Sequence, residues 1–584
     1  MKELQYLNKY FVKYKFQFLL GVLITIVSSV FALFGPTYIG DMVTAVQQFT
    51  KGEITADAVK SILFTGIMVI LGTTLIRGIF TFFMRQTLIV MSRHVEFDLK
   101  NEIFRQYENL SLSFYKAQRT GDLMSRISSD VDRVRQYVGP AIMYALSTVI
   151  LFVVILTQMI IISPELTMYT LLPLPLLAWS IYKVASQINK RSTLVQQNVS
   201  ALSSYTQEMF SGIRLIKAYA LEGLKLEGFT ALSREGKKRT MRLAFVSALF
   251  GPLMILLIGI SNLVVIYVGG KMYINGTMQM GTIAEFILYI NMLTWPVASI
   301  GWISGMIQEA EASQKRINEF LKIKPDIVNN NEAHTPLLGN IAFENVSFTY
   351  EDTGIHALKN VSFTINKGET LAILGRTGSG KSTVLSLISR MYDTTLGTVK
   401  VDSEDVKLLN LHDLRNSVGF VPQDAFLFSD SIENNIKFGK EDATHDEVVA
   451  VAKKAVVHHN IETFTHQYET ILGERGITLS GGQKQRVSIA RAMIKDAPIL
   501  LLDDCLSAVD TETEEAILNN LLDFSKDKTT IIVSHRVSSA KNADRIIILE
   551  DGEIIEQGTH NQLVNRQGYY KELYLKQLSE KEIG

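Results

Sequence analysis

The sequence predicts two parts: an all-α membrane domain of six transmembrane helices, then an α/β domain built around a phosphate-binding loop. The 584-residue chain is 47% hydrophobic and only 20% charged. This balance is too apolar for a soluble protein and too charged for a purely membrane one. Long apolar segments lie in the first half, and a glycine-rich motif between a strand-like and a helix-like run lies in the second.

Six apolar segments are long enough to cross a hydrocarbon layer of about 30 Å. They cover residues 16–39, 62–83, 138–162, 166–184, 245–268 and 283–303. Six spans put both termini on one side of the membrane. Lys and Arg gather before the first span and after the second and fourth, whereas the other connections hold only Lys51. The positive-inside rule therefore predicts a multi-pass protein of the cytoplasmic membrane, with both termini and the second domain in the cytoplasm.

Several residues within the spans have more than one interpretation. Pro36, Pro173 and Pro175 should kink or loosen their helices. Arg77 could contact an anionic substrate, but snorkelling to the interface or a structural bond between helices accounts for more residues of this kind. The polar stretches between spans are too long for structureless loops, so we expect helices that run out of the membrane.

The glycine-rich motif fits the P-loop pattern G-x-x-x-x-G-K-[ST]. The strand-like residues 370–374 precede it and the helix-like residues 382–387 follow it. Its backbone N–H groups should wrap a β-phosphate, Lys381 should reach the β- and γ-phosphate oxygens, and Ser382 should bind Mg²⁺. The candidate nucleotide-binding residues here are Gly375, Arg376, Thr377, Gly378, Ser379, Gly380, Lys381, Ser382 and Thr383.

Two apolar runs further on predict buried parallel strands that end near the same site. Ile499–Asp503 ends in a carboxylate, which makes Asp503 a second Mg²⁺ anchor. Residues 530–533 end at Ser534 and His535. His535 is a candidate γ-phosphate sensor at the ligand-binding edge of the sheet, although a lone histidine at a strand end is more often a surface residue.

The sequence Leu479, Ser480, Gly481, Gly482, Gln483 resembles the signature loop of the ATP-binding cassette (ABC) transporters of exporter type, and this resemblance covers essentially the whole chain. The resemblance implies that this loop reaches across a dimer to the nucleotide held by a partner's P-loop. It also implies that Tyr350 stacks on adenine, that Gln423 is a metal and water ligand, that Asp510 belongs to a dimer contact, and that His535 contacts the γ-phosphate. ATP and Mg²⁺ are the implied cofactors.

One position departs from the family pattern. Members that hydrolyse ATP efficiently usually carry Glu directly after the Walker B Asp, and this chain has Asp504. A carboxylate that is one methylene shorter reaches about 1.5 Å less toward the attacking water. Misplacement by about 1 Å can cost roughly a hundredfold in rate. The alternative is that Asp504 is an adequate base, directly or through an extra water.

The weak carboxylate and the intact signature loop belong to different composite sites of such a dimer. This asymmetry resembles the heterodimeric exporters, in which one site is degenerate. We therefore expect a non-identical partner half-transporter with Glu at the matching position. A zero formal net charge argues against a nucleic-acid partner.

The expected domains are a transmembrane domain (1–322), a linker (323–338) rich in Pro and Asn, and an ABC nucleotide-binding domain (339–584) with a helical subdomain that carries the signature. Residues 113–126 and 212–219 resemble the exporters' intracellular coupling segments. The expected function is ATP-driven export of hydrophobic or amphipathic small molecules across a lipid bilayer by alternating access. The alternatives are a homodimeric lipid flippase and a non-transporting, ATP-sensing regulatory subunit.

Overall fold

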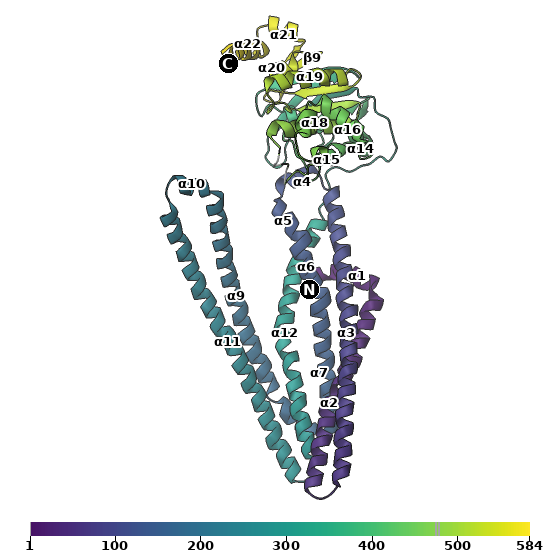
Figure 1. The fold of residues 1–584 in the computed structure, drawn as a ribbon, viewed down its shortest axis with the longest axis vertical. Coiled ribbons are helices and arrows are strands. Elements are labelled where there is room, and N and C mark those ends of the chain that lie inside the picture. Colours follow the sequence, from purple (N-terminus) through teal and green to yellow (C-terminus); the bar gives the residue numbers. More distant parts are fainter. Residues whose placement is uncertain (1, 474–475, 477–478, 584) are drawn as a thin grey trace. The chain divides into compact units, whose positions relative to one another are not determined.

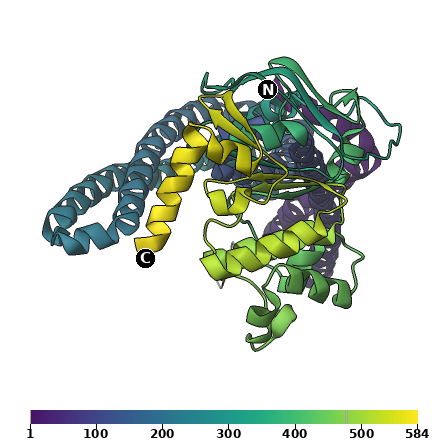
Figure 2. The same ribbon diagram turned by 90° about the horizontal axis from the view of Figure 1, so that it is seen from above.

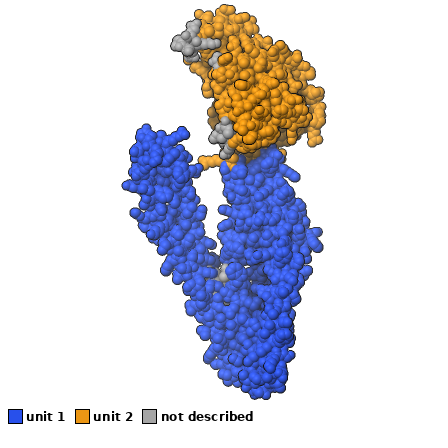
Figure 3. All heavy atoms as spheres, viewed as in Figure 1, with its two compact units in different colours: residues 1–108, 121–323 blue, residues 109–120, 324–584 orange. Residues whose placement is uncertain are grey.

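The computed structural model describes residues 2–473, 476 and 479–583, and all structural statements below refer to these residues. The chain forms two compact units, which are described separately (Figure 3). Unit 1 comprises residues 1–108 and 121–323, and unit 2 comprises residues 109–120 and 324–584.

Unit 1 is entirely helical. Its long helices are α2 (Lys15–Thr50), α3 (Ala56–Asn109), α7 (Ile142–Ile162), α9 (Leu174–Ser211), α11 (Glu222–Ile274) and α12 (Met280–Leu321). Its short helices are η1 (Glu3–Leu7), α1 (Asn8–Lys13), α5 (Thr120–Ser125), α6 (Val131–Gln136), α8 (Pro164–Leu171) and α10 (Ile213–Ala218), and two π-helical turns, η2 (Arg126–Asp130) and η3 (Tyr137–Ala141), flank α6.

Five helical stretches among the described residues are long and apolar enough to cross a membrane: Lys15–Thr50, Ala56–Asn109, Thr120–Ile162, Glu222–Ile274 and Met280–Leu321. They contain five of the six expected spans. The stretches of 36 to 54 residues also confirm that helices continue beyond the apolar segments.

The fourth expected span is divided between α8 and α9. The interruption falls at Leu172 and Pro173, where the backbone stays in the right-handed helical region (φ −56° and −73°). Pro173 and Pro175 have no N–H to donate, so the helical hydrogen bonds lapse without a reversal of the chain. Proline therefore loosens this span, as expected, whereas α2 continues unbroken through Pro36.

Helices α2 and α12 touch backbone to backbone. A Cβ added to Gly281 would lie 1.9 Å from the Gly40 carbonyl oxygen, so the contact requires glycine. Nearby, the buried Glu285 carboxylate accepts hydrogen bonds from Thr37 (2.8 Å) and Tyr289 (2.7 Å). This polar contact joins the two helices within an otherwise apolar core.

Helices α9 and α11 run side by side and are joined at one end by α10 (Figure 1). Toward α10 the pair stands apart from the other helices of unit 1 (Figure 1).

Unit 2 contains two sheets. The antiparallel sheet has the order β2-β1-β4-β5, and the six-stranded sheet has the order β10-β9-β3-β8-β7-β6. All strands of the larger sheet are parallel to their neighbours except β10. The strands are β1 (Ile341–Thr349), β2 (His356–Ile365), β3 (Thr370–Gly375), β4 (Leu396–Val401), β5 (Glu404–Asp405), β6 (Val418–Val421), β7 (Ile499–Asp503), β8 (Thr529–Val533), β9 (Arg545–Glu550) and β10 (Glu553–Gly558).

The helices of unit 2 cover the larger sheet and form a helical subdomain beside it. They are α4 (Leu112–Ala117), α13 (Lys381–Ile388), α14 (Leu411–Asn416), α15 (Ile432–Lys437), α16 (His445–Lys454), α17 (His458–Glu462), η4 (Gln467–Glu469), α18 (Gly481–Ile494), α19 (Thr511–Phe524), α20 (Val537–Ala540), α21 (His560–Asn565) and α22 (Tyr569–Ile583), which leads to the C-terminus marked in Figure 2. Buried apolar residues of α15 to α19 share one core with β6, β7 and β8. Unit 2 is thus an α/β domain with a helical subdomain, as the sequence predicted.

Candidate functional site

The sheet register gathers four predicted site segments at one edge. Val421 of β6 pairs with Leu502 of β7, Leu502 with Ile532 of β8, and Val533 with Ile373 of β3. The carboxyl ends of these parallel strands therefore meet side by side. The segments that follow them carry Gln423, Asp503, His535 and the P-loop. This edge is where ligands of parallel α/β sheets bind.

The P-loop leaves β3 through glycines that no other residue can replace without strain. A Cβ on Gly375 would lie 2.1 Å from the Leu549 carbonyl oxygen. At Gly380, φ is +98° and a Cβ would lie 2.3 Å from the Ala357 carbonyl oxygen. These close approaches fix the turn from β3 to α13. Because glycine has no side chain, the loop backbone at these positions is not covered by one.

Lys381 begins α13 and is buried, with 6% of its surface exposed. Its ammonium donates to the carbonyl oxygens of Gly375 (2.9 Å) and Arg376 (2.7 Å). Burial lowers the pKa of Lys381 to about 8, although the Asp503 and Asp504 carboxylates act in the opposite direction. These two hydrogen bonds hold the Lys381 ammonium inside the loop. The negative charge of a bound phosphate would stabilise its protonated form.

The loop has a second feature that fits an oxyanion. The Ser379 hydroxyl oxygen is buried and has no hydrogen-bond partner among the described residues. A buried hydroxyl without a partner is costly, and a bound phosphate oxygen would satisfy it. Arg376, by contrast, is 73% exposed and lies 3.8 Å from Glu550.

Ser382 and Asp503 come together across 121 residues of sequence. The Ser382 hydroxyl donates to Asp503 Oδ1 at 2.9 Å. Burial raises the pKa of Asp503, the Ser382 hydrogen bond lowers it, and Asp504 raises it again. A hydroxyl and a carboxylate are hard oxygen donors of the kind Mg²⁺ uses beside nucleotide phosphates, so the pair fits this ion.

Asp504 lies one residue beyond β7 in a conformation that is unusual for a residue with a side chain. Its φ is +41°, and its backbone N–H donates to the Val533 carbonyl oxygen at 2.9 Å. Burial raises the pKa of its carboxyl, while the ring and the backbone N–H of His535 lower it. This half-buried carboxylate therefore lies beside His535.

The adjacent Cys505 is buried, which raises the pKa of its thiol to about 12, so the thiol stays protonated and inert.

Gln577 holds the backbone around His535, and no sequence motif identified it. Its Nε2 donates to the His535 carbonyl oxygen (2.9 Å), and its Oε1 accepts from the Val537 N–H (2.8 Å). Tyr570, fully buried in the core under α20, anchors α22, which carries Gln577.

Tyr350 lies in an aromatic cluster at the end of β1. Its hydroxyl is 3.0 Å from the Thr383 hydroxyl of α13, which ties it to the P-loop helix. Its ring packs edge to face against Phe348 and Tyr392. The Lys116 ammonium of α4 lies 5.0 Å from the centre of the Tyr350 ring, and these residues border a cavity of about 700 Å³. Sequence reasoning missed Lys116, which is more than 200 residues away.

The signature loop caps its own helix. Ser480 and Gln483 form a capping box at the start of α18, in which the Ser480 hydroxyl accepts from the Gln483 N–H. Leu479 is buried in the subdomain core. The glycines at the start of α18 thus lie at a helix N-terminus, where backbone N–H groups attract anions.

The segment of residues 507–510 packs against α18. A Cβ on Gly482 would lie 2.8 Å from the Ala508 carbonyl oxygen. Gln485, just after the signature loop, donates to Ser507 Oγ (3.1 Å) and accepts from the Ala508 N–H (3.0 Å). Asp510 caps α19 by accepting from the Thr513 N–H (3.0 Å), which lowers the pKa of its carboxyl.

Gln423 is exposed on the loop after β6, and its side chain makes no hydrogen bond within the described parts of the chain. The register places it at the same sheet edge as Asp503, but the structure shows no direct contact between the two.

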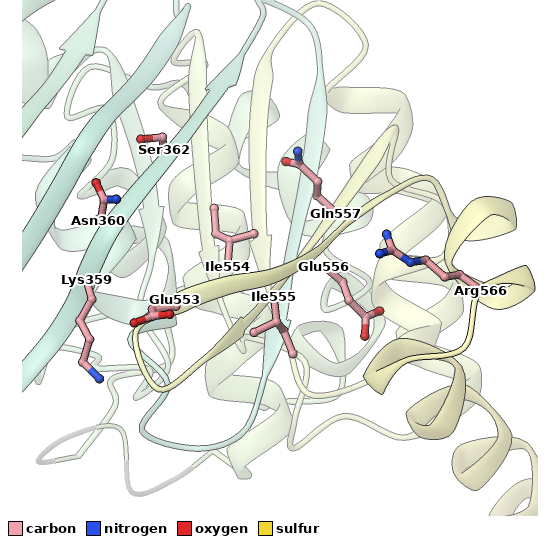
Figure 4. Close-up of a pocket in the computed structure, with 9 residues that line it drawn as sticks. All are labelled: Lys359, Asn360, Ser362, Glu553, Ile554, Ile555, Glu556, Gln557 and Arg566. Atoms are coloured by element: carbon pink, nitrogen blue, oxygen red, sulfur yellow. The ribbon is translucent and has the colours of Figure 1, made fainter.

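A separate pocket of about 500 Å³ lies between β2 and β10 (Figure 4). Its lining carries both signs of charge, including Lys359, Glu553, Glu556 and Arg566. None of the predicted nucleotide-site residues lines it, and Glu556 binds the start of α22. This pocket is therefore not part of the phosphate site.

A membrane domain of long helices followed by a P-loop domain with a helical signature subdomain defines an ABC exporter. Residues 18–297 match the family described as the ABC transporter transmembrane region, and residues 358–507 match the family described as ABC transporter. The chain belongs to this family and is an ATPase coupled to transmembrane transport.

Several relatives match over most of the chain. A probable multidrug resistance ABC transporter ATP-binding/permease protein, YheI, of Bacillus subtilis is 34% identical over 98% of this chain and 97% of its own length. An ATP-dependent lipid A-core flippase of Syntrophus aciditrophicus is 33% identical over 87% of this chain and 85% of its own length. The structure of a bacterial Atm1-family ABC exporter with ATP bound superposes with a TM-score of 0.78 at 25% identity, and covers 98% of both chains.

Proposed function

We propose that this chain is one half of a heterodimeric exporter of hydrophobic or amphipathic molecules, and that its own nucleotide site turns over slowly. In this proposal ATP is sandwiched between the P-loop of one chain and the signature loop of the other. The membrane domain lies in the cytoplasmic membrane, with the ATPase domain in the cytoplasm.

In the proposed site, the bare P-loop backbone and Lys381 bind the β- and γ-phosphates, and Tyr350 stacks on adenine. Ser382 and Asp503 would hold Mg²⁺, with Gln423 as a further candidate ligand. When bound, Mg²⁺ neutralises negative charge on the phosphate oxygens. His535 donates to the γ-phosphate, and Asp504 accepts a proton from the attacking water.

The single observation that carries the proposal is Asp504. Its carboxylate has one methylene less than Glu, and its backbone is held by the bond from its N–H to the Val533 carbonyl. The fixed backbone cannot easily move forward to compensate for the shorter side chain. A base held about 1.5 Å too far back predicts slow hydrolysis in this site.

The signature loop supports the other half of the proposal. Leu479 to Gln483 keep the full motif, and the capping box and Gly482–Ala508 contact hold the loop in order. This loop would complete the partner's site, in which we expect Glu at the position that matches Asp504. In this proposal, the chain has a slow nucleotide site of its own and supplies an intact signature loop to the faster site of its partner.

The substrate class is proposed from the relatives. One is described as a probable multidrug resistance transporter and another as a lipid A-core flippase. Both descriptions fit apolar or amphipathic cargo, so a homodimeric lipid flippase is the second candidate. Substrate that stimulates ATP turnover equally in the lone chain and in a mixed complex would favour this second candidate.

The test is single-turnover ATP hydrolysis by the purified chain in nanodiscs, compared with Asp504→Glu. We expect the variant to hydrolyse bound ATP roughly ten to a hundred times faster, because the carboxylate regains its reach. Asp551→Glu is the matched control, since Asp551 is exposed and also has a positive φ (+46°). Equal rates for wild type and Asp504→Glu would overturn the slow-site proposal.

A further inference from the structure

We propose that Glu514 of α19 is a positioning residue for ATP hydrolysis, which fixes His535 relative to Asp504 without contacting the nucleotide. This inference rests on the roles of His535 and Asp504 in the function proposed above. It adds a residue that lies outside the predicted site.

Glu514 is a buried carboxylate that receives three side-chain donors. Only 2% of its surface is exposed. Its Oε1 accepts from the hydroxyls of Ser538 and Ser539, both at 2.9 Å, and its Oε2 pairs with the Arg536 guanidinium. Removing a carboxylate from water is costly, and good hydrogen bonds are needed to offset that cost. All three donors lie within four residues after His535, so one carboxylate gathers the side chains of this segment.

The segment after His535 has little structure of its own. Its helix α20 spans only Val537–Ala540, and the residue before it makes no side-chain cap. A single helical turn is not stable in isolation. Side chains from other helices hold it instead: Gln577 of α22 binds its backbone, and Glu514 of α19 binds its side chains. The placement of His535 therefore depends on α19 as well as on α22.

Helix α19 is itself held firmly. Its residues Ile517 and Leu521 are buried in the same hydrophobic core as Leu502 of β7. Strand β7 ends directly before Asp504. The helix that carries Glu514 and the strand that leads to Asp504 thus pack in one core, so a side chain on the helix can fix a position relative to the end of the strand.

Arg536 extends the contact to the segment that precedes α19. Its Nη2 donates to the Ser507 carbonyl oxygen at 3.4 Å, and the Ser507 hydroxyl donates to the Asp504 carbonyl oxygen at 3.0 Å. Through Arg536 and Ser507, the Glu514 carboxylate is thus linked to the backbone of the proposed base. A hydrogen bond between two charged groups is stronger than one between neutral groups, so the charge of Glu514 matters to this link.

The test is single-turnover ATP hydrolysis by the full-length chain in nanodiscs, with any subunit that co-purifies, in the Asp504→Glu background. Glu514→Gln keeps the size of the side chain and removes its charge. We expect hydrolysis to slow about tenfold, because a shift of less than 1 Å at His535 already lowers the rate. Binding of ATP should change by less than about twofold, since the contacts of Glu514 with Arg536, Ser538 and Ser539 do not include the P-loop. Glu515→Gln is the matched control, because it makes the same change at the next, exposed residue of α19.

A second background separates positioning from a general loss of structure. If Glu514 acts through His535, Glu514→Gln should slow hydrolysis by less than about twofold when His535→Ala is already present. A general loss of structure would instead slow both backgrounds by the same factor. If Glu514→Gln does not fold, the pair Ser538→Ala and Ser539→Ala replaces it. This pair removes two donors and keeps the carboxylate, and it should slow hydrolysis about threefold only while His535 is present.

The outcomes distinguish this inference from the proposed function. An unchanged rate in Glu514→Gln, with a slow His535→Ala, would overturn the positioning role of Glu514 and leave the proposed function standing. Equal losses with and without His535 would overturn it as well, and a fully active His535→Ala would remove the role of His535 and this inference together. A wild type as fast as Asp504→Glu would count against the slow site alone, because each effect of Glu514→Gln is a ratio within one background.

Discussion

Gln577→Ala should impair hydrolysis without impairing nucleotide binding. Gln577 bridges the His535 carbonyl oxygen (2.9 Å) and the Val537 N–H (2.8 Å), which lie on either side of Arg536. The substitution removes both hydrogen bonds and leaves a buried N–H unpaired at Val537, which is 3% exposed. We therefore expect the backbone that carries His535 to loosen.

The magnitude follows from the two lost contacts. Each net hydrogen bond contributes about 1 kcal/mol, so domain stability should fall by about 2 kcal/mol. Misplacement by about 1 Å can cost roughly a hundredfold in rate. The His535 segment keeps its bond from the Ser534 N–H to the Ile373 carbonyl oxygen, so we expect a smaller loss, about tenfold in turnover.

The assay is steady-state ATP hydrolysis in the Asp504→Glu background, where this chain's own site carries the rate. Binding of ATP should change by less than about twofold, since Gln577 touches none of the P-loop residues. Lys576→Ala is the matched control, because it removes an exposed side chain from the same helix. Unchanged turnover, or a loss of ATP affinity as large as the loss of turnover, would refute the positioning role of Gln577.

Three further predictions concern the phosphate site. Ser382→Ala should raise the Mg²⁺ concentration needed for half-maximal hydrolysis about tenfold, because Asp503 loses the hydroxyl that donates to it and the metal loses a ligand. An unchanged Mg²⁺ dependence, measured by titration, would contradict the assignment. ATP affinity should fall as pH rises above about 8, because Lys381 loses its proton there in the free protein. The same pKa lies below the ordinary value for lysine, so the unfolded chain binds more protons between pH 8 and about 10.5, and stability should rise with pH across that window. Lys381→Arg should abolish the pH dependence of affinity, and an unaltered profile in this variant would argue against Lys381 as its source.

The phosphate site was largely predictable because its residues lie beside strands with a clear pattern. The strand expected at Ile499–Asp503 is β7, and the run expected before the P-loop is β3. Parallel strands place their carboxyl ends together, so these motifs converge once the sheet order is known. Local sequence does not encode the order of the strands in the sheet. The roles predicted for the individual site residues remain predictions.

The parts that sequence reasoning missed depend on long-range packing. Gln577 reaches His535 from a helix 42 residues away, and Lys116 reaches Tyr350 from the other half of the chain. Gln577 lies in no motif, and the resemblance of residues 113–126 to a coupling segment does not single out Lys116. In the fourth span, by contrast, Pro173 and Pro175 predicted the loosening that the structure shows, because proline has no N–H to donate.

The most direct test of the central claim compares ATP hydrolysis by this chain alone with hydrolysis by a complex that contains a half-transporter with Glu at the position matching Asp504. The account predicts that the lone chain is nearly inert, and that the mixed complex hydrolyses ATP at least about tenfold faster. Full, cooperative turnover by the lone chain would contradict it and would make Asp504 a competent base in a homodimeric exporter.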